Sequence, residues 1–231
     1  MGLTLIDLLL IPVTYLYILG VIYYITKLRK SEKISGFMAR KVIHIAIGGL
    51  VILCPILFSV NWLPTLIGVS FILFTFFTCP LSPIPKFKLD VFKTGNSLGV
   101  VYYSISLTLL IYFFFDMGWL LQVGFLPVVF GDAFANIIGV KYGKNKILNL
   151  EKTLEGTLAA FIVTFIVLIV ILSLYHALGL FDYQFSTILL ISLSIAVISS
   201  IVELISPFGL DNLTIPLFCT IAGLFIEQLI S

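Results

Sequence analysis

Long apolar runs separated by short polar segments fill the chain. The hydrocarbon core of a bilayer is about 30 Å thick, and a helix needs roughly 20 residues to cross it. Runs near this length lie at about 3–25, 42–60, 64–79, 98–115, 119–138, 154–175, 185–205 and 213–230. We therefore predict an all-α, polytopic bundle of about eight transmembrane helices in a single integral membrane domain, 1–231. The run at 64–79 is short and begins near Pro64, so a re-entrant segment and seven crossings are the alternative.

Composition supports this interpretation and excludes an ordinary soluble domain. Hydrophobic residues make up 61% of the 231 residues and charged residues 10%, whereas soluble domains carry about 25% charged residues. Cys54, Cys79 and Cys219 are scattered through the apolar runs, so neither a disulfide framework nor a zinc site is suggested. Membrane lipids are expected partners, and we expect no nucleic-acid partner.

Positive charge follows a regular pattern along the chain. All 13 lysines and arginines follow odd-numbered runs, within 27–41, 86–93 and 141–152. Cytoplasmic loops are enriched in these residues, so the odd loops are predicted to face the cytoplasm and both termini to face away from it. The pattern also favours eight crossings, because omitting the third run would place 86–93 on the wrong side.

Four polar clusters lie at this predicted cytoplasmic face, at 38–49, 131–143, 149–159 and 202–217. In the first, Arg40, Lys41 and His44 are three and four residues apart, so they share one helix face. Interfacial anchoring explains the two cations. His44, one turn deeper, favours a functional site.

The second cluster combines a carboxylate, an amide and small residues at helical spacing. Asp132, Ala135, Asn136, Gly139 and Gly143 recur at intervals of three and four residues. Close helix packing explains the glycines. It does not explain Asp132, because an ionisable group costs about 2.5–3.5 kcal/mol at the bilayer centre and calls for a wet or metal-filled cavity.

The third and fourth clusters add charges at the ends of apolar runs. Thr153 can cap the following helix, and Lys152 beside the first-turn amides would form an anion site, with a plain Lys152–Glu155 ion pair as the alternative. Glu203 lies inside an apolar run. Asp211 and Asn212 begin the last run, where helix capping is an alternative role.

Carboxylates and cations therefore gather at one membrane face. Mg²⁺ is usually held by one or two carboxylates plus substrate phosphates, and Lys and Arg bind phosphates. The residues predict a metal-dependent site for a phosphorylated soluble substrate, with a second substrate supplied by the bilayer.

These clusters resemble, in the same order, the motifs of the membrane polyprenol kinase family, which includes phytol kinase, dolichol kinase and a CTP-using diacylglycerol kinase. The matching segments are RKVIH at 40–44, GDAFANIIGVKYG at 131–143, EKTLEGTLA at 151–159 and VELISPFGLDNLTIPL at 202–217. The resemblance implies transfer of the γ-phosphate of a nucleotide, typically CTP, to a lipid alcohol such as phytol, geranylgeraniol or a dolichol-like prenol. Family members often carry Lys-Ser where this chain has Lys152-Thr153, a change that keeps the hydroxyl.

The resemblance and the residue chemistry together suggest candidate roles. The expected catalytic residues are Asp132, His44, Lys152, Arg40 and Lys41. The expected nucleotide-binding residues are Gly131, Asn136, Gly139, Lys144, Lys152, Thr153, Glu155 and Gly156. The expected Mg²⁺ ligands are Asp132, Asp211, Asn212 and Glu155, and Glu203 is assigned to the lipid substrate. The general base is left open between His44 and a carboxylate.

Two other classes of protein are considered. The central segment is also similar to phosphatidate cytidylyltransferase, another CTP enzyme, but its KR, KD and HGG-type C-terminal signature is missing and Asp211-Asn212 stands instead. A transporter also carries intramembrane carboxylates. Transporter sites commonly lie near the midplane between internal repeats, which this sequence does not show.

Overall fold

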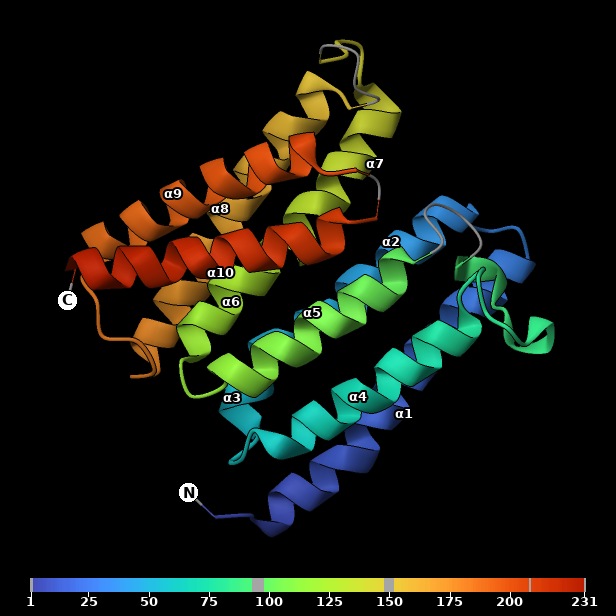
Figure 1. The fold of residues 1–231 in the computed structure, drawn as a ribbon, viewed down its shortest axis with the longest axis horizontal. Coiled ribbons are helices and arrows are strands. Elements are labelled where there is room, and N and C mark those ends of the chain that lie inside the picture. The colour runs from blue at the N-terminus through green and yellow to red at the C-terminus, as the bar shows by residue number, and fades with distance from the viewer. Residues whose placement is uncertain (1, 93–97, 148–151, 208, 231) are drawn as a thin grey trace. The chain divides into compact units, whose positions relative to one another are not determined.

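The computed structural model describes residues 2–92, 98–147, 152–207 and 209–230, which form helices and connecting loops without a β-sheet (Figure 1). Contacts divide the chain into two compact units. Unit 1 comprises Met1–Asp116 and Phe208–Leu213, and unit 2 comprises Met117–Pro207 and Thr214–Ser231. The predicted all-α class is confirmed, whereas a single membrane domain stays a prediction.

All eight predicted apolar runs are helical. Within the described residues, six helical segments are long and apolar enough to cross a membrane: Leu5–Lys30, Gly36–Leu57, Gly118–Tyr142, Leu154–Ala177, Phe185–Ile205 and Asp211–Leu229. The other two, Trp62–Thr78 and Gly99–Phe114, are apolar but shorter. The number of crossings and the side of each terminus stay predictions.

Unit 1 is built from five main helical segments and short 3-10 turns. Its elements are α1 (Leu5–Lys30), α2 (Gly36–Gly48), η1 (Gly49–Ile52), α3 (Cys54–Leu57), α4 (Trp62–Thr78), η2 (Pro85–Phe87), η3 (Asp90–Phe92) and α5 (Gly99–Phe114). Helices α4 and α5 lie side by side, and α1 contacts both α2 and α4 (Figure 1). A Cβ atom on Gly68 of α4 would lie 2.4 Å from Thr108 Oγ1 of α5, so this close approach requires glycine.

A buried carboxylate fixes the start of α1. Asp7 accepts hydrogen bonds from the backbone N of Thr4 at 2.8 Å and from the backbone N of Ser59 at 2.7 Å. The Thr4 hydroxyl accepts in turn from the Asp7 backbone N, which completes a capping box. The same carboxylate thus caps α1 and ties it to the segment that follows α3.

Unit 2 is organised around α8. Its elements are α6 (Gly118–Leu126), η4 (Pro127–Asp132), α7 (Ala133–Tyr142), α8 (Leu154–Ala177), α9 (Phe185–Ile205) and α10 (Asp211–Ile230), whose first residues belong to unit 1. Helix α8 packs against α6, α7 and α9 (Figure 1). Inside this unit Gln122 Nε2 donates to the buried Tyr175 hydroxyl at 2.7 Å, so a polar contact links α6 to α8 within an apolar core.

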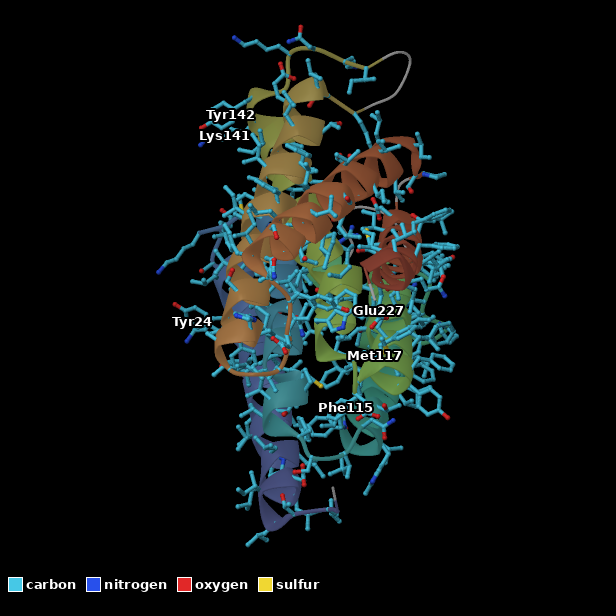
Figure 2. All side chains as sticks on the ribbon, turned by 90° about the vertical axis from the view of Figure 1, so that its left-hand side faces the viewer. Tyr24, Phe115, Met117, Lys141, Tyr142 and Glu227 are labelled. Atoms are coloured by element: carbon cyan, nitrogen blue, oxygen red, sulfur yellow. The ribbon has the colours of Figure 1, made fainter. Side chains whose placement is uncertain are left out.

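The end of α7 carries an exposed cation and an aromatic ring. Figure 2 labels Lys141 and Tyr142 there, and the Lys141 ammonium lies 5.0 Å from the centre of the Tyr142 ring. Tyrosine is enriched at membrane–water interfaces, and long cationic side chains reach toward the interface from helix ends. These two residues therefore suit the end of a membrane-spanning segment.

Candidate functional site

The predicted site residues divide between the two units. Unit 1 contains Arg40, Lys41, His44, Asp211 and Asn212. Unit 2 contains Gly131, Asp132, Asn136, Gly139, Lys144, Lys152, Thr153, Glu155, Gly156 and Glu203. Each unit thus has its own polar cluster.

Asp132 is positioned by an irregular turn in unit 2. It ends η4, a π-helical turn that begins at Pro127, and its side chain is buried. Such turns inside α-helices often occur at functional sites. Asn136, one turn later, donates through Nδ2 to Asp132 Oδ1 at 2.7 Å and to the Asp132 backbone oxygen at 2.8 Å. The predicted sharing of one helix face by these two residues is confirmed, and the amide orients the carboxylate.

Lys152 forms a buried ion pair with Glu203. Lys152 Nζ lies 2.8 Å from Glu203 Oε1, with side chains only 11% and 6% exposed, and it also donates to the Glu203 backbone oxygen. The pair joins Lys152, two residues before α8, to the end of α9. Opposite charges stabilise each other strongly only where water is largely excluded, so this pair holds the Lys152 ammonium firmly in place.

Glu155 ties the basic loop to the start of α8. Its carboxylate accepts from the Asn145 side-chain Nδ2 at 2.9 Å and from the Asn145 backbone N at 3.3 Å. The predicted capping role of Thr153 is confirmed, because its hydroxyl accepts from the Gly156 backbone N at 3.2 Å. Lys144 is exposed in the same loop. The loop therefore presents cations beside the N-terminus of a long helix.

The glycines expected to bind nucleotide lie at close contacts within unit 2. A Cβ on Gly131 would lie 2.3 Å from Thr164 Oγ1, and one on Gly139 would lie 3.1 Å from Thr153 Oγ1. A Cβ on Gly156 would lie 2.8 Å from the Ala135 backbone oxygen. Helix packing accounts for these glycines, and their contact with a nucleotide stays a prediction.

Replacing Gly156 with Ala is expected to destabilise the protein by about 1–3 kcal/mol, because the backbone oxygen of Ala135 cannot rotate away from the added methyl group. Thermal unfolding of the purified protein in detergent measures the change. Gly20→Ala is the matched control, since nothing lies within 4 Å of its Cβ position. Equal unfolding temperatures for the Gly156 variant and wild type would contradict the packing role.

In unit 1, Arg40 and Asn212 meet over the start of α5. A Cβ on Gly99 would lie 2.8 Å from Arg40 Nη2 and 3.2 Å from Asn212 Nδ2. Asp211 Oδ1 accepts from the Asn212 backbone N at 2.9 Å and from its Nδ2 at 3.2 Å. Ser106 Oγ donates to the Asn212 backbone oxygen at 2.6 Å. Helix α5 therefore holds the Asp211-Asn212 pair beside Arg40.

Asn212 has one side-chain atom without a partner. Its side chain is 4% exposed, and Oδ1 is buried with no hydrogen-bond partner in the part of the chain that the structure describes. Leaving a buried acceptor unsatisfied costs about 1–3 kcal/mol. Such an atom is a place where a bound donor would be stabilised.

His44 is packed against an aromatic residue that sequence reasoning missed. The ring centres of His44 and Tyr103 are 3.9 Å apart, and Tyr103 Oη donates to the His44 backbone oxygen at 2.9 Å. Gly99, Tyr103 and Ser106 recur at helical spacing on α5, which was the signal available in the sequence. Lys41 is buried on α2.

An apolar cavity of about 160 Å³ lies inside unit 1. Its polar end is lined by Arg40, His44, Gly99 and Asn212. It is also lined by Leu57, the last residue of α3, and by Ile111, near the C-terminal end of α5. Its apolar walls include Ile18, Ile43, Leu50, Phe71 and Leu107. The cavity follows α5 from Gly99 to Ile111, a length of about 18 Å at 1.5 Å per residue. Glu203, expected to meet the lipid, is not among the lining residues.

The oxygen donors of each unit fit a sparse Mg²⁺ site. Among the residues described, no group of three or more His, Cys, Asp or Glu side chains is placed to hold a metal ion. Unit 2 offers the buried Asp132 carboxylate, and unit 1 offers Asp211 with the unpartnered Asn212 Oδ1. Because Mg²⁺ usually takes one or two carboxylates and substrate phosphates, these donors suit a metal that arrives with a nucleotide. The metal itself stays a prediction.

Comparison with known proteins finds a similarity to a named kinase. The chain is 28% identical over 186 residues to a protein of Synechocystis sp. named phytol kinase, and the aligned region covers 78% of this chain and 75% of the relative. No protein-family model matches the chain. No solved structure matches it at a significant level. The similarity agrees with the family indicated by the four ordered motifs.

Proposed function

Because its similarity to a phytol kinase supports membership of the polyprenol and phytol kinase family, we propose that this membrane protein is a CTP-dependent lipid alcohol kinase. It transfers the γ-phosphate of CTP to the hydroxyl of a prenol, such as phytol, geranylgeraniol or a dolichol-like alcohol. The products are a prenyl phosphate and CDP. The observation that carries the proposal is the set of charged side chains, Asp132, Lys152 and Glu203, that unit 2 holds within and beside its apolar helices.

In unit 2, Lys152 and the basic loop with Lys144 bind the phosphates of the nucleotide. Phosphoryl transfer passes through a loose transition state, so its rate depends on positioning and electrostatics. Lys152 neutralises the negative charge on the transferring phosphoryl group. Glu203 is buried against Lys152. Its geometry supports a positioning role toward that lysine in place of the lipid contact expected from the sequence.

In unit 2, Asp132 would provide a carboxylate for Mg²⁺, with Glu155 as the further oxygen donor that the sequence suggests. In unit 1, the sequence suggests the Asp211 carboxylate for the same role. When bound, Mg²⁺ neutralises charge on the β- and γ-phosphates. Asn136 holds the Asp132 carboxylate in one orientation through its 2.7 Å hydrogen bond. Asp211 is held by the backbone and side chain of Asn212.

In unit 1, Arg40 and Lys41 add positive charge for the phosphoryl group. A general base must lie within hydrogen-bond reach of the proton that it removes. Either His44 or a carboxylate accepts the proton of the attacking hydroxyl. The contact with Tyr103 limits the orientations open to the His44 ring. The lysine-rich loops support a location of this chemistry at the cytoplasmic face, where nucleotides are available.

Transfer of label from CTP tests the proposal. The purified protein is supplied with Mg²⁺, a panel of prenols, diacylglycerol, and CTP labelled at either the α- or the γ-phosphate. We expect γ-label in a prenol product and no α-label in any lipid. Label from the α-phosphate would instead indicate cytidylyl transfer, and no label in any lipid would contradict both lipid reactions.

A further inference from the structure

We infer that the apolar cavity of unit 1 binds the tail of the lipid alcohol and that Asn212 Oδ1 accepts a hydrogen bond from its hydroxyl group. The inference rests on the proposed function and gives its lipid substrate a location. The occupant is a single-chain alcohol with an apolar tail and one hydroxyl at its end.

The cavity wall is chemically apolar along its length. Besides Thr14 and Tyr103, whose hydroxyl donates to the His44 backbone oxygen, three hydroxyl residues line it: Thr75, Ser104 and Thr108. Each donates a hydrogen bond to a backbone oxygen of its own helix, at 2.8 Å for Thr75, 3.1 Å for Ser104 and 2.7 Å for Thr108. Their donors are thus already used, and the wall presents mainly methyl groups, methylene groups and aromatic rings. Such a surface favours a hydrocarbon chain over water.

The length of the cavity suits one lipid tail. It extends about 18 Å along α5, close to half of the roughly 30 Å hydrocarbon thickness of a bilayer. One lipid tail occupies about that depth in a membrane leaflet. The contact between Gly68 and Thr108 brings α4 against α5 at this wall, so the two helices close the cavity side there.

The polar end of the cavity offers an unused acceptor. The Asn212 backbone and side-chain N–H groups donate to Asp211 Oδ1, and its backbone oxygen accepts from Ser106. Oδ1 is buried and has no partner among the described residues. The hydroxyl group of the lipid alcohol supplies the missing donor. The hydroxyl oxygen then lies at the end of the cavity that Arg40 and His44 line. We therefore assign Asn212 to the alcohol in preference to the metal.

Photolabelling tests the location of the tail without relying on catalysis. The purified full chain in detergent is irradiated with a prenol that carries a diazirine on its tail, with no nucleotide present, and the labelled peptides are identified by mass spectrometry. Label is expected in α2 and α5. Ser104→Phe and Leu107→Trp, which fill the cavity, should each reduce labelling about tenfold, a change of 1.4 kcal/mol in affinity.

Leu109→Phe is the matched control, because Leu109 lies on the same helix but is 47% exposed and does not line the cavity. It should label like wild type. Thermal unfolding identifies any cavity variant that fails to fold, and the other variant then decides. Label confined to unit 2, or full labelling in a folded cavity variant, would overturn the inference.

A second comparison tests the hydroxyl contact. Wild type should label more strongly with the diazirine prenol than with the same hydrocarbon lacking its hydroxyl, and Asn212→Leu should remove this preference. An equal preference in the variant would overturn the role of Oδ1. If wild type phosphorylates prenols but the label lies elsewhere, the location alone is wrong. If the cavity is labelled but no phosphate is transferred, the proposed kinase function alone is wrong.

Discussion

Replacing Asp132 with Asn is expected to lower prenol phosphorylation by about 10²–10³-fold or more, because this carboxylate would hold the Mg²⁺ that stabilises charge in the transition state, and losing one such stabilising interaction commonly costs that much. The carboxylate is buried at the end of η4 and is oriented by Asn136. Removing its charge weakens the proposed binding of Mg²⁺ with the nucleotide.

The same substitution should leave the protein folded in the membrane. An asparagine at position 132 has nearly the same shape as aspartate, and its Oδ1 can still accept from Asn136 Nδ2. The measurements are kcat/KM with CTP and a prenol, the amount of protein in the membrane fraction, and thermal unfolding. Asp182→Asn is the control, since Asp182 is exposed in a loop of the same unit. Wild-type turnover in the Asp132 variant would contradict the assignment.

Lys152 is expected to affect both activity and stability. Lys152→Met should abolish detectable turnover and destabilise the protein by about 3–5 kcal/mol, because it leaves the Glu203 carboxylate buried without its cation. Kinase assays and denaturation in detergent measure the two effects separately. The stability loss is expected because both side chains are almost completely buried.

A double variant separates catalysis from folding. Lys152→Met combined with Glu203→Gln removes both charges, so it should recover most of the lost stability, as apolar or neutral replacements of buried pairs often do. Activity should stay absent, since the phosphates still lack the ammonium. Recovery of turnover together with stability would show that Lys152 has only a structural role.

The helices could be predicted from sequence because an apolar run of membrane length must satisfy its backbone hydrogen bonds within its own segment, which a helix does. Local irregularities could not. The run at 42–60 is divided into α2, η1 and α3 near Pro55, and the π-helical turn at Pro127 lies inside a run that reads as one regular helix. Both depend on how the residues around each proline pack.

The candidate site was predictable in composition but not in pairing. Helical spacing identified Arg40 with His44 and Asp132 with Asn136, because neighbours at three or four residues share a face. The Lys152–Glu203 pair joins residues 51 positions apart, and Ser106 contacts Asn212 across 106 positions. No local pattern encodes such contacts. The cavity and the unpartnered Asn212 Oδ1 likewise arise only when several helices of unit 1 pack together.

The central claim is that this chain phosphorylates a lipid alcohol. The most direct measurement is the stoichiometry of the products made by the purified protein from CTP, Mg²⁺ and phytol, identified by mass spectrometry. The account predicts one prenyl monophosphate for each CDP, with no product when Mg²⁺ is removed by a chelator and almost none in the Asp132→Asn variant. Release of pyrophosphate with a cytidylyl lipid, or no lipid phosphate from any prenol, would contradict it.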